Sequence, residues 1–241
     1  MKFIGTLSWH SFLRHKFNLY VLFLLLLCIS MPSLAEDDIS DFPIIEYKAT
    51  YENSPQIFYI SGDGGMNEFS KSLCRKFNDK GYSVIALDAK KYFWKEKTPE
   101  MFIKDISTLI LHYQSIWHGD SFVVMGYSFG ADVGAFIPAR LPVDLVKKMK
   151  FSVFLNPSTS TDFEIKLMDM LGKEHNNRKY NIILELNSLE GTPVICLMSE
   201  DEISKISGKI QNEYIKVKIL PGDHRFNFDY NLIVNTVIAL L

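Results

Sequence analysis

A serine at position 128 lies between two glycines, in the sequence GYSFG over residues 126–130. This G-x-S-x-G spacing is typical of a nucleophile elbow, in which a sharp turn from a strand into a helix exposes a serine hydroxyl. Positions 126 and 130 must be small in such a turn, because side chains there would collide with the neighbouring strand or helix. An apolar run over residues 122–125 precedes the motif, and a helix-compatible segment follows it. An ordinary strand–turn–helix junction has the same pattern, so the interpretation depends on whether the chain also supplies a base.

A histidine late in the chain is the best candidate for that base. Serine needs a neighbouring base to take its proton, and histidine is the usual one. His224 directly follows the last predicted strand, in LPGDHRF over residues 220–226, and loops after parallel strands gather at one edge of a sheet. Elsewhere, His112 and His118 lie in or beside a predicted helix, and His175 lies in a polar run. We therefore predict that His224 is the general base.

An acidic residue that orients the imidazole is expected between the serine and the histidine, after the predicted strand 194–198. Glu200, Asp201 and Glu202 are all available there. Counting from Pro193, the position of the acid corresponds best to Glu202, with Asp201 next. The three carboxylates remain alternatives at this point.

Two backbone N–H groups must converge on the negative charge that develops on the attacked carbonyl. One is expected from Phe129, directly after the serine. The other is expected from the loop SGDGGM over residues 61–66, where Gly64, Gly65 and Met66 are the candidates. This loop contains neither GxGxxG nor GxxxxGK[ST], so its position after an early strand favours an oxyanion hole over a phosphate site.

Strands and helices alternate from residue 44 onward and would position these residues. Apolar strands are predicted at 44–50, 57–60, 83–87, 122–125, 151–155, 194–198 and 214–220. Helices are predicted at 67–79, 98–117, 131–140 and 229–241. An insertion at 157–180 is predicted to contain a short helix, 163–171, and residues 181–186 form either a strand or part of that insertion. Buried strands separated by helices predict one α/β domain, with a mainly parallel sheet covered by helices on both faces.

The N-terminal segment has a different character. Basic residues precede an almost wholly apolar run at 17–31, and Ser33 and Ala35 are small residues where a signal peptidase reads the chain. The run is shorter than a typical membrane-spanning helix. We therefore predict a cleaved signal peptide at 1–35 and a periplasmic domain at 36–241.

Charge and cysteine content narrow the function classes further. The chain has a formal net charge of −2, and loss of the three basic residues in 1–35 would make it −5. No clustered positive charge indicates nucleic-acid binding. No CxxC or His/Cys cluster indicates a metal site, and no cofactor is expected. Cys74 and Cys196 either pair in an oxidising compartment or remain free thiols, and both readings stay open.

Several further motifs accompany the elbow and the histidine. They are SGDGG at 61–65, KYFW at 91–94, KTPE at 97–100, GYSFGADV at 126–133, RLP at 140–142, DFE at 162–164, LPG at 220–222 and DY at 229–230. Together they resemble the VirJ/AcvB group of secreted bacterial α/β-hydrolase-like proteins, over about residues 55–240. Ser128 and His224 carry over directly from that resemblance. Met66 departs from it, where a tryptophan is expected, and so does Arg225, where a second histidine is expected.

The resemblance implies a periplasmic protein that hydrolyses aminoacyl-phosphatidylglycerol, with type IV secretion and virulence as the setting of some members. Such a substrate is a carboxylic ester, which suits acyl transfer, and its lipid part needs apolar contact. Trp94, in an aromatic run, is a candidate for that contact, although aromatic runs more often belong to a core. Asp63 and Asp132 are candidate partners for a cationic aminoacyl group. An acid in the first turn of a helix, as at Asp132, also complements the helix dipole.

The predicted function is therefore a periplasmic serine hydrolase acting on an aminoacyl phospholipid or another ester. The membrane surface and secretion-system components are its candidate partners. The competing function is a non-catalytic accessory or assembly factor of a type IV secretion system, because a fold alone does not decide activity.

Overall fold

The computed structural model describes residues 39–50, 55–166 and 178–241. Residues 39–241 form one compact unit. The predicted signal peptide, 1–35, lies outside the described residues. No helix within the described ranges is both long and apolar enough to cross a membrane.

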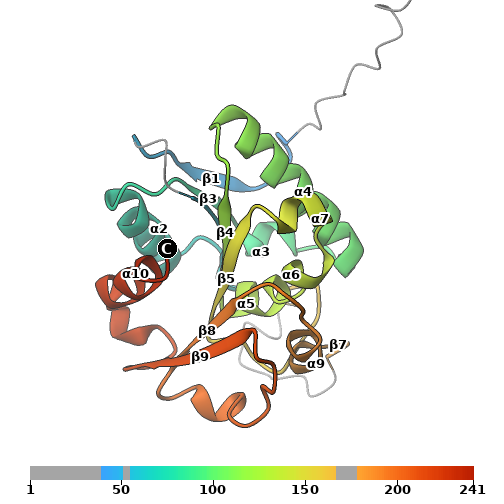
Figure 1. Ribbon diagram of the computed structural model, residues 1–241, viewed down its shortest axis with the longest axis vertical. Helices are drawn as coiled ribbons and strands as arrows, with labels where there is room; N and C mark the ends of the chain where they lie inside the picture. Colours follow the sequence, from blue (N-terminus) through green and yellow to red (C-terminus); the bar gives the residue numbers. More distant parts are fainter. Residues whose placement is uncertain (1–38, 51–54, 167–177) are drawn as a thin grey trace, which may run out of the picture. The chain divides into compact units, whose positions relative to one another are not determined.

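A single large sheet organises the described part of the chain (Figure 1). Its seven strands are β1 (Ile44–Tyr47), β2 (Gln56–Ile60), β3 (Val84–Leu87), β4 (Phe122–Tyr127), β5 (Met149–Leu155), β8 (Val194–Ser199) and β9 (Ile215–Leu220). They lie in the order β1-β3-β2-β4-β5-β8-β9. Only β1 runs antiparallel to its neighbour in this sheet. The prediction of a mainly parallel α/β fold is confirmed.

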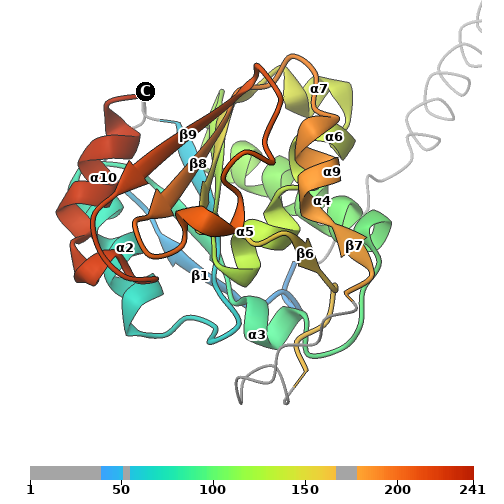
Figure 2. The ribbon, with the colours of Figure 1, turned by 90° about the horizontal axis from the view of Figure 1, so that it is seen from below.

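Helices cover both faces of this sheet, as Figure 2 shows. One face carries α2 (Glu68–Asp79) and α10 (Tyr230–Ile238), which contact each other. The other face carries α3 (Ala89–Tyr92), α4 (Pro99–Ile116), α5 (Phe129–Gly134), α6 (Ile137–Arg140), α7 (Val143–Val146) and α9 (Ile182–Asn187). A small hairpin of β6 (Ser160–Thr161) and β7 (Tyr180–Asn181) lies beside them.

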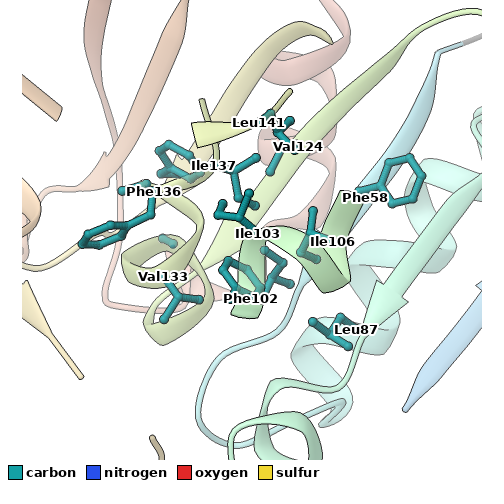
Figure 3. Close-up of a cluster of buried hydrophobic side chains, with 14 of the residues drawn as sticks. Phe58, Leu87, Phe102, Ile103, Ile106, Val124, Val133, Phe136, Ile137 and Leu141 are labelled. Carbon is teal, nitrogen blue, oxygen red and sulfur yellow. The ribbon is translucent and has the colours of Figure 1, made fainter. Parts of the chain in front are cut away.

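Two apolar cores follow from the alternation of side chains along the strands. Phe58 and Val124 point into one core, where they pack with Phe102 and Ile106 of α4 (Figure 3). Their strand neighbours, such as Tyr59, belong to the second core, under α2 and α10. Because both faces are buried, β2 and β4 read as continuous apolar runs rather than alternating ones.

The helix starts follow the expected capping chemistry. The Thr98 side chain accepts a hydrogen bond from the Met101 N–H, and Pro99 occupies the first turn of α4. This confirms the predicted start of that helix, because proline is tolerated where an N–H has no helical partner anyway.

The predicted helix at 163–171 is wrong in its described part. Residues 163–166 are not helical. The Phe163 carbonyl accepts from the Lys97 N–H, and the Ile165 N–H donates to the Phe93 carbonyl. The backbone is thus bonded to the segment after α3 instead of to itself, and the Phe163 ring is buried in the core. The remainder, 167–171, lies outside the described residues.

For residues 181–186, a strand and part of the insertion were both open. The strand is wrong: residues 182–187 form the helix α9, with Asn181 as N-cap and Ile182 and Leu186 buried four residues apart. The helix after the elbow is interrupted between α5 and α6. Pro138 lacks the N–H that would bond to the Gly134 carbonyl, so one continuous helix to residue 140 cannot form.

Candidate active site

Ser128 occupies a sharp turn between β4 and α5. Its backbone has φ +52° and ψ −123°, a conformation that L-residues rarely adopt and that is often found at functional sites. The flanking glycines make this turn sterically feasible. A Cβ at Gly126 would lie 2.2 Å from the Gly130 carbonyl oxygen, and a Cβ at Gly130 would lie 2.2 Å from the Ile60 carbonyl oxygen. The strand–turn–helix arrangement expected of an elbow is therefore present.

The structure brings His224 to this serine. His224 Nε2 lies 3.0 Å from Ser128 Oγ, a normal hydrogen-bond distance. The histidine lies in the loop after β9, and its side chain is about 40% exposed. A base within reach of the hydroxyl and open to solvent can exchange protons with a substrate and with water.

Of the three candidate acids, the structure places Glu202 beside the imidazole. Glu202 Oε1 lies 3.6 Å from His224 Nδ1, and the carboxylate also forms an ion pair with Lys205. This distance is within ion-pair range but longer than a hydrogen bond. Glu200 and Asp201 are exposed and make no hydrogen bond or ion pair with His224 among the described residues.

Two side chains hold the backbone of His224. Asn156 Nδ2 donates to the His224 carbonyl oxygen at 3.0 Å, and the Tyr127 hydroxyl donates to the same oxygen at 3.3 Å. Asn156 Oδ1 accepts from the Ser199 N–H at 2.7 Å, so this buried amide links the ends of β5 and β8 to the histidine loop. Its backbone has φ +50°, which asparagine tolerates better than most residues. Sequence reasoning missed Asn156; its one signal was a polar residue directly after a buried strand at the carboxyl edge.

The loop around His224 is also braced from within. Asp223 Oδ1 accepts from the Arg225 N–H at 2.8 Å and from the Asn227 N–H at 3.0 Å. These backbone hydrogen bonds lower the pKa of Asp223 below its usual value. Phe226 is fully buried two residues after the histidine and anchors the loop to the core under α10.

The candidate oxyanion donors differ in whether their backbone N–H groups already form a hydrogen bond. Phe129 is the first residue of α5, so its N–H has no carbonyl within that helix to bond to. The glycine-rich loop passes directly against the nucleophile, because a Cβ at Gly62 would lie 3.5 Å from Ser128 Cβ. The Gly65 N–H donates to the Gly62 carbonyl at 2.9 Å, so in this structure that donor is used within the loop itself. The N–H groups of Gly64 and Met66 form no such backbone bond in the described residues, and neither does that of Asp63.

The residues predicted to contact substrate differ in solvent exposure. Trp94 is 54% exposed, and it lines a pocket of about 560 Å³ together with Gly64, Gly65 and Lys90. Its neighbours Tyr92 and Phe93 are buried in the core. Trp94 is therefore the one residue of this aromatic run that remains accessible.

Asp63 is partly exposed, but Asp132 is buried beneath the surface. The Asp132 carboxylate accepts from the Ser158 N–H at 2.6 Å and from the Ser158 hydroxyl at 2.9 Å. Burial raises the pKa of Asp132 to about 7. In this structure the Asp132 carboxylate joins α5 to the segment after β5, and its role as a partner for a cationic substrate group stays a prediction.

Cysteines and metal ligands complete the inventory of reactive groups. Cys74 and Cys196 are free, buried thiols. Burial raises the pKa of the Cys196 thiol to about 12, so it stays protonated at neutral pH. Within the described residues, no group of three or more His, Cys, Asp or Glu side chains could hold a metal ion.

Comparison with known proteins agrees with this fold. A family model described as "Bacterial virulence protein (VirJ)" matches residues 55–241. No curated protein matches the chain by sequence.

Among solved structures, MenH from S. aureus aligns with a TM-score of 0.57 at 14% identity, covering 82% of this chain and 97% of that one. A lipase-esterase related protein from Clostridium acetobutylicum aligns with a TM-score of 0.58 at 15% identity, covering 83% and 100%. Est1E from Butyrivibrio proteoclasticus aligns with a TM-score of 0.55 at 14% identity, covering 80% and 89%. At these identities the likeness shows the α/β-hydrolase fold alone.

Proposed function

Because the chain belongs to the VirJ family of bacterial virulence proteins and has the α/β-hydrolase fold, we propose that it is a serine hydrolase that cleaves a carboxylic ester. The observation that carries this proposal is the 3.0 Å contact between Ser128 Oγ and His224 Nε2 at the carboxyl edge of the sheet. A strained serine and a histidine that meet there, from positions 96 residues apart, form the pair that acyl transfer needs.

In the proposed first step, Ser128 Oγ attacks the ester carbonyl carbon while His224 Nε2 takes the hydroxyl proton. This requires the tautomer with a proton on Nδ1, the nitrogen that faces Glu202. Glu202 favours that tautomer and stabilises the imidazolium cation that forms. The carbonyl oxygen becomes an oxyanion bonded to a tetrahedral carbon.

Backbone N–H groups at the elbow would stabilise that oxyanion. Phe129 supplies one donor from the first position of α5. The second comes from the loop that passes against Ser128 at Gly62, where the N–H groups of Asp63, Gly64 and Met66 remain available. Fixed donors of this kind act where charge develops, so each is worth about 10²–10³-fold in rate.

The tetrahedral intermediate then collapses and releases the alcohol. His224 returns the proton to the alcohol oxygen as the carbon–oxygen bond breaks, which leaves an acyl group on Ser128. A water molecule, deprotonated by the same imidazole, attacks this acyl-serine. The bond between the acyl carbon and Ser128 Oγ then breaks, the imidazolium returns its proton to Oγ, and the carboxylic acid leaves. Half exposure of His224 gives that water access.

The substrate we propose is an aminoacyl phospholipid, of the aminoacyl-phosphatidylglycerol kind. Family membership and the exposed Trp94 beside the candidate oxyanion loop support this choice, because the lipid part needs apolar contact. Asp63, partly exposed in that loop, is the more accessible candidate for an aminoacyl ammonium group. We place the protein in the periplasm after removal of residues 1–35, where it would meet lipids from the outer side of the inner membrane.

Replacing Ser128 with Ala tests the proposal. The hydroxyl is the nucleophile, so Ser128→Ala is expected to lower ester turnover by at least about 10³-fold and to abolish labelling by a fluorophosphonate probe. His224→Ala should do the same, with the fold of both variants checked by circular dichroism. A folded wild-type protein that the probe does not label would contradict the enzyme and favour a non-catalytic assembly factor of a secretion system.

A further inference from the structure

A short segment after β3 gathers positive charge and exposed apolar side chains at the edge of the candidate site. We define the basic rim as Lys90, Lys91, Trp94, Lys95 and Met101. Trp94 is 54% exposed and Met101 is 48% exposed, although most large apolar side chains of this fold are buried. The two line one pocket of about 330 Å³ together with Lys91, Lys95, Lys97 and the acidic Glu96.

The lysines of the rim are largely unneutralised. Among the described residues, Lys90 and Lys95 form no ion pair, and Lys91 pairs at 3.8 Å with Asp88, whose side chain is largely buried. Lys97 is excluded from the rim, because it pairs with Asp105 at 3.5 Å and lies over the Tyr92 ring. Glu96, an exposed acid next to Lys95, offsets one of the three lysine charges, so the rim keeps a net positive charge on a chain whose formal charge is −2.

The rim is continuous with the candidate site. Leu87, Ile60 and Gly126 are paired side by side at the carboxyl ends of β3, β2 and β4. The loops that follow these strands therefore share one edge of the sheet: the rim, the glycine-rich loop and the elbow. Trp94 and Lys90 form one wall of the 560 Å³ pocket, and the glycine-rich loop forms another.

We propose that the basic rim docks on the surface of an anionic phospholipid bilayer and presents the candidate site to it. Lysine ammonium groups near an anionic bilayer are attracted to the lipid phosphates. A tryptophan with an apolar body and a polar N–H is suited to the headgroup region. The inference rests on the proposed function, in that docking at this edge brings an ester-bearing headgroup toward the loop beside Ser128.

Vesicle co-sedimentation tests this surface. The chain is purified after export, and mass spectrometry verifies that every variant has the same N-terminus, so differences report the rim alone. The wild type should bind vesicles containing about one-third phosphatidylglycerol roughly tenfold better than pure phosphatidylcholine vesicles at low salt, and this preference should fall as salt rises. Equal binding to the two kinds of vesicle would overturn the proposal.

Substitutions in the rim sharpen the test. Lys90→Gln with Lys95→Gln should lower binding to the anionic vesicles about tenfold, and Trp94→Ala should lower it about fivefold. The matched controls are Lys216→Gln with Lys218→Gln, exposed on β9 at the far end of the sheet, and Leu184→Ala, exposed on α9. Controls that lower binding as much as the rim variants would also overturn the proposal.

Turnover of a water-soluble ester by the wild type separates this inference from the proposed function. If the wild type turns over the ester through Ser128 but does not prefer anionic vesicles, the docking proposal is wrong and the proposed hydrolase activity stands. If the basic rim is needed for vesicle binding but the protein turns over no ester, the proposed hydrolase activity is wrong and the rim remains a membrane-docking surface.

Discussion

The elbow, residues 126–130, and the histidine loop, residues 221–228, hold the two candidate reacting groups in different ways. At the elbow, backbone packs on backbone, so closely that a single Cβ at Gly126 or Gly130 would overlap a carbonyl oxygen. In the histidine loop, by contrast, the position of His224 depends on hydrogen bonds to its carbonyl from Asn156 and Tyr127.

The difference shows two ways to fix a reacting group. Steric fixation requires particular residues, the glycines, at fixed spacing around Ser128. Hydrogen-bond fixation recruits partners from other strands and leaves the imidazole half exposed. We therefore expect substitutions at the elbow to damage the fold, and substitutions around the histidine loop to damage catalysis while the fold persists.

Gly126→Ala should have the largest effect and should act on stability. The new Cβ would lie 2.2 Å from the Gly130 carbonyl oxygen, and backbone on both sides of that contact is buried, so we expect a loss of about 4 kcal/mol or more. Gly191→Ala is the matched control: it has φ +77° with no atom within 4 Å of the added Cβ, so it should cost only about 1 kcal/mol. Urea unfolding measures both. Similar losses at the two positions would mean that steric contact does not fix the elbow.

Glu202→Gln should lower kcat by about 10³-fold while the protein stays folded. A neutral amide cannot stabilise the imidazolium that forms on His224. Asp201→Asn is the control, and it should change kcat less than about twofold, because Asp201 is exposed and makes no contact with the imidazole. Steady-state kinetics on a soluble ester decides the matter. A larger loss at Asp201 would reassign the acid.

Asn156→Asp should lower kcat by about 10²-fold, with a smaller change in KM. The variant keeps the shape of the side chain but replaces the donor to the His224 carbonyl with an acceptor, so the imidazole loses its position relative to Ser128. Tyr127→Phe removes the longer, 3.3 Å bond to the same carbonyl and should cost less than tenfold. If Asn156→Asp unfolds the protein instead, the histidine loop is fixed by the same structure as the elbow and the contrast fails.

The sequence alone predicted the elbow, where steric contact fixes Ser128. The glycines at 126 and 130, the apolar run before them and the capping residues Thr98 and Pro99 are local signals, and the strand–turn–helix order follows from them. Periodicity also predicted the parallel sheet, because strands buried on both faces read as continuous apolar runs.

The position of the histidine loop depends on hydrogen bonds between segments far apart in the chain, and no local sequence pattern predicts them. Asn156 lies 68 residues from the histidine whose carbonyl it binds. Counting along the chain ranked Glu202 before Asp201 among three adjacent acids, but only the turn after β8 shows which carboxylate lies at the imidazole. The helix predicted at 163–171 failed for the same reason, since its described backbone bonds to Phe93 and Lys97, far away in the chain.

Asp132 links the helix that follows the elbow to the segment that carries Asn156, and its titration gives the last and smallest effect. The carboxyl group on α5 binds Ser158, two residues after Asn156, and burial raises its pKa from 3.8 to about 7. Between these two pH values the folded protein holds a proton that the unfolded chain has lost, so this group makes stability fall as pH rises from about 4 to 7.

Asp132→Asn removes that titration, so the fall in unfolding free energy between pH 5 and pH 8 should be smaller in the variant than in the wild type by about 2 kcal/mol. Urea unfolding of both proteins at the two pH values measures the difference. Parallel profiles would mean that the two donors of Ser158 outweigh burial and keep Asp132 ionised. The two hydrogen bonds from Ser158 would then be made to a charged carboxylate at every pH near neutrality.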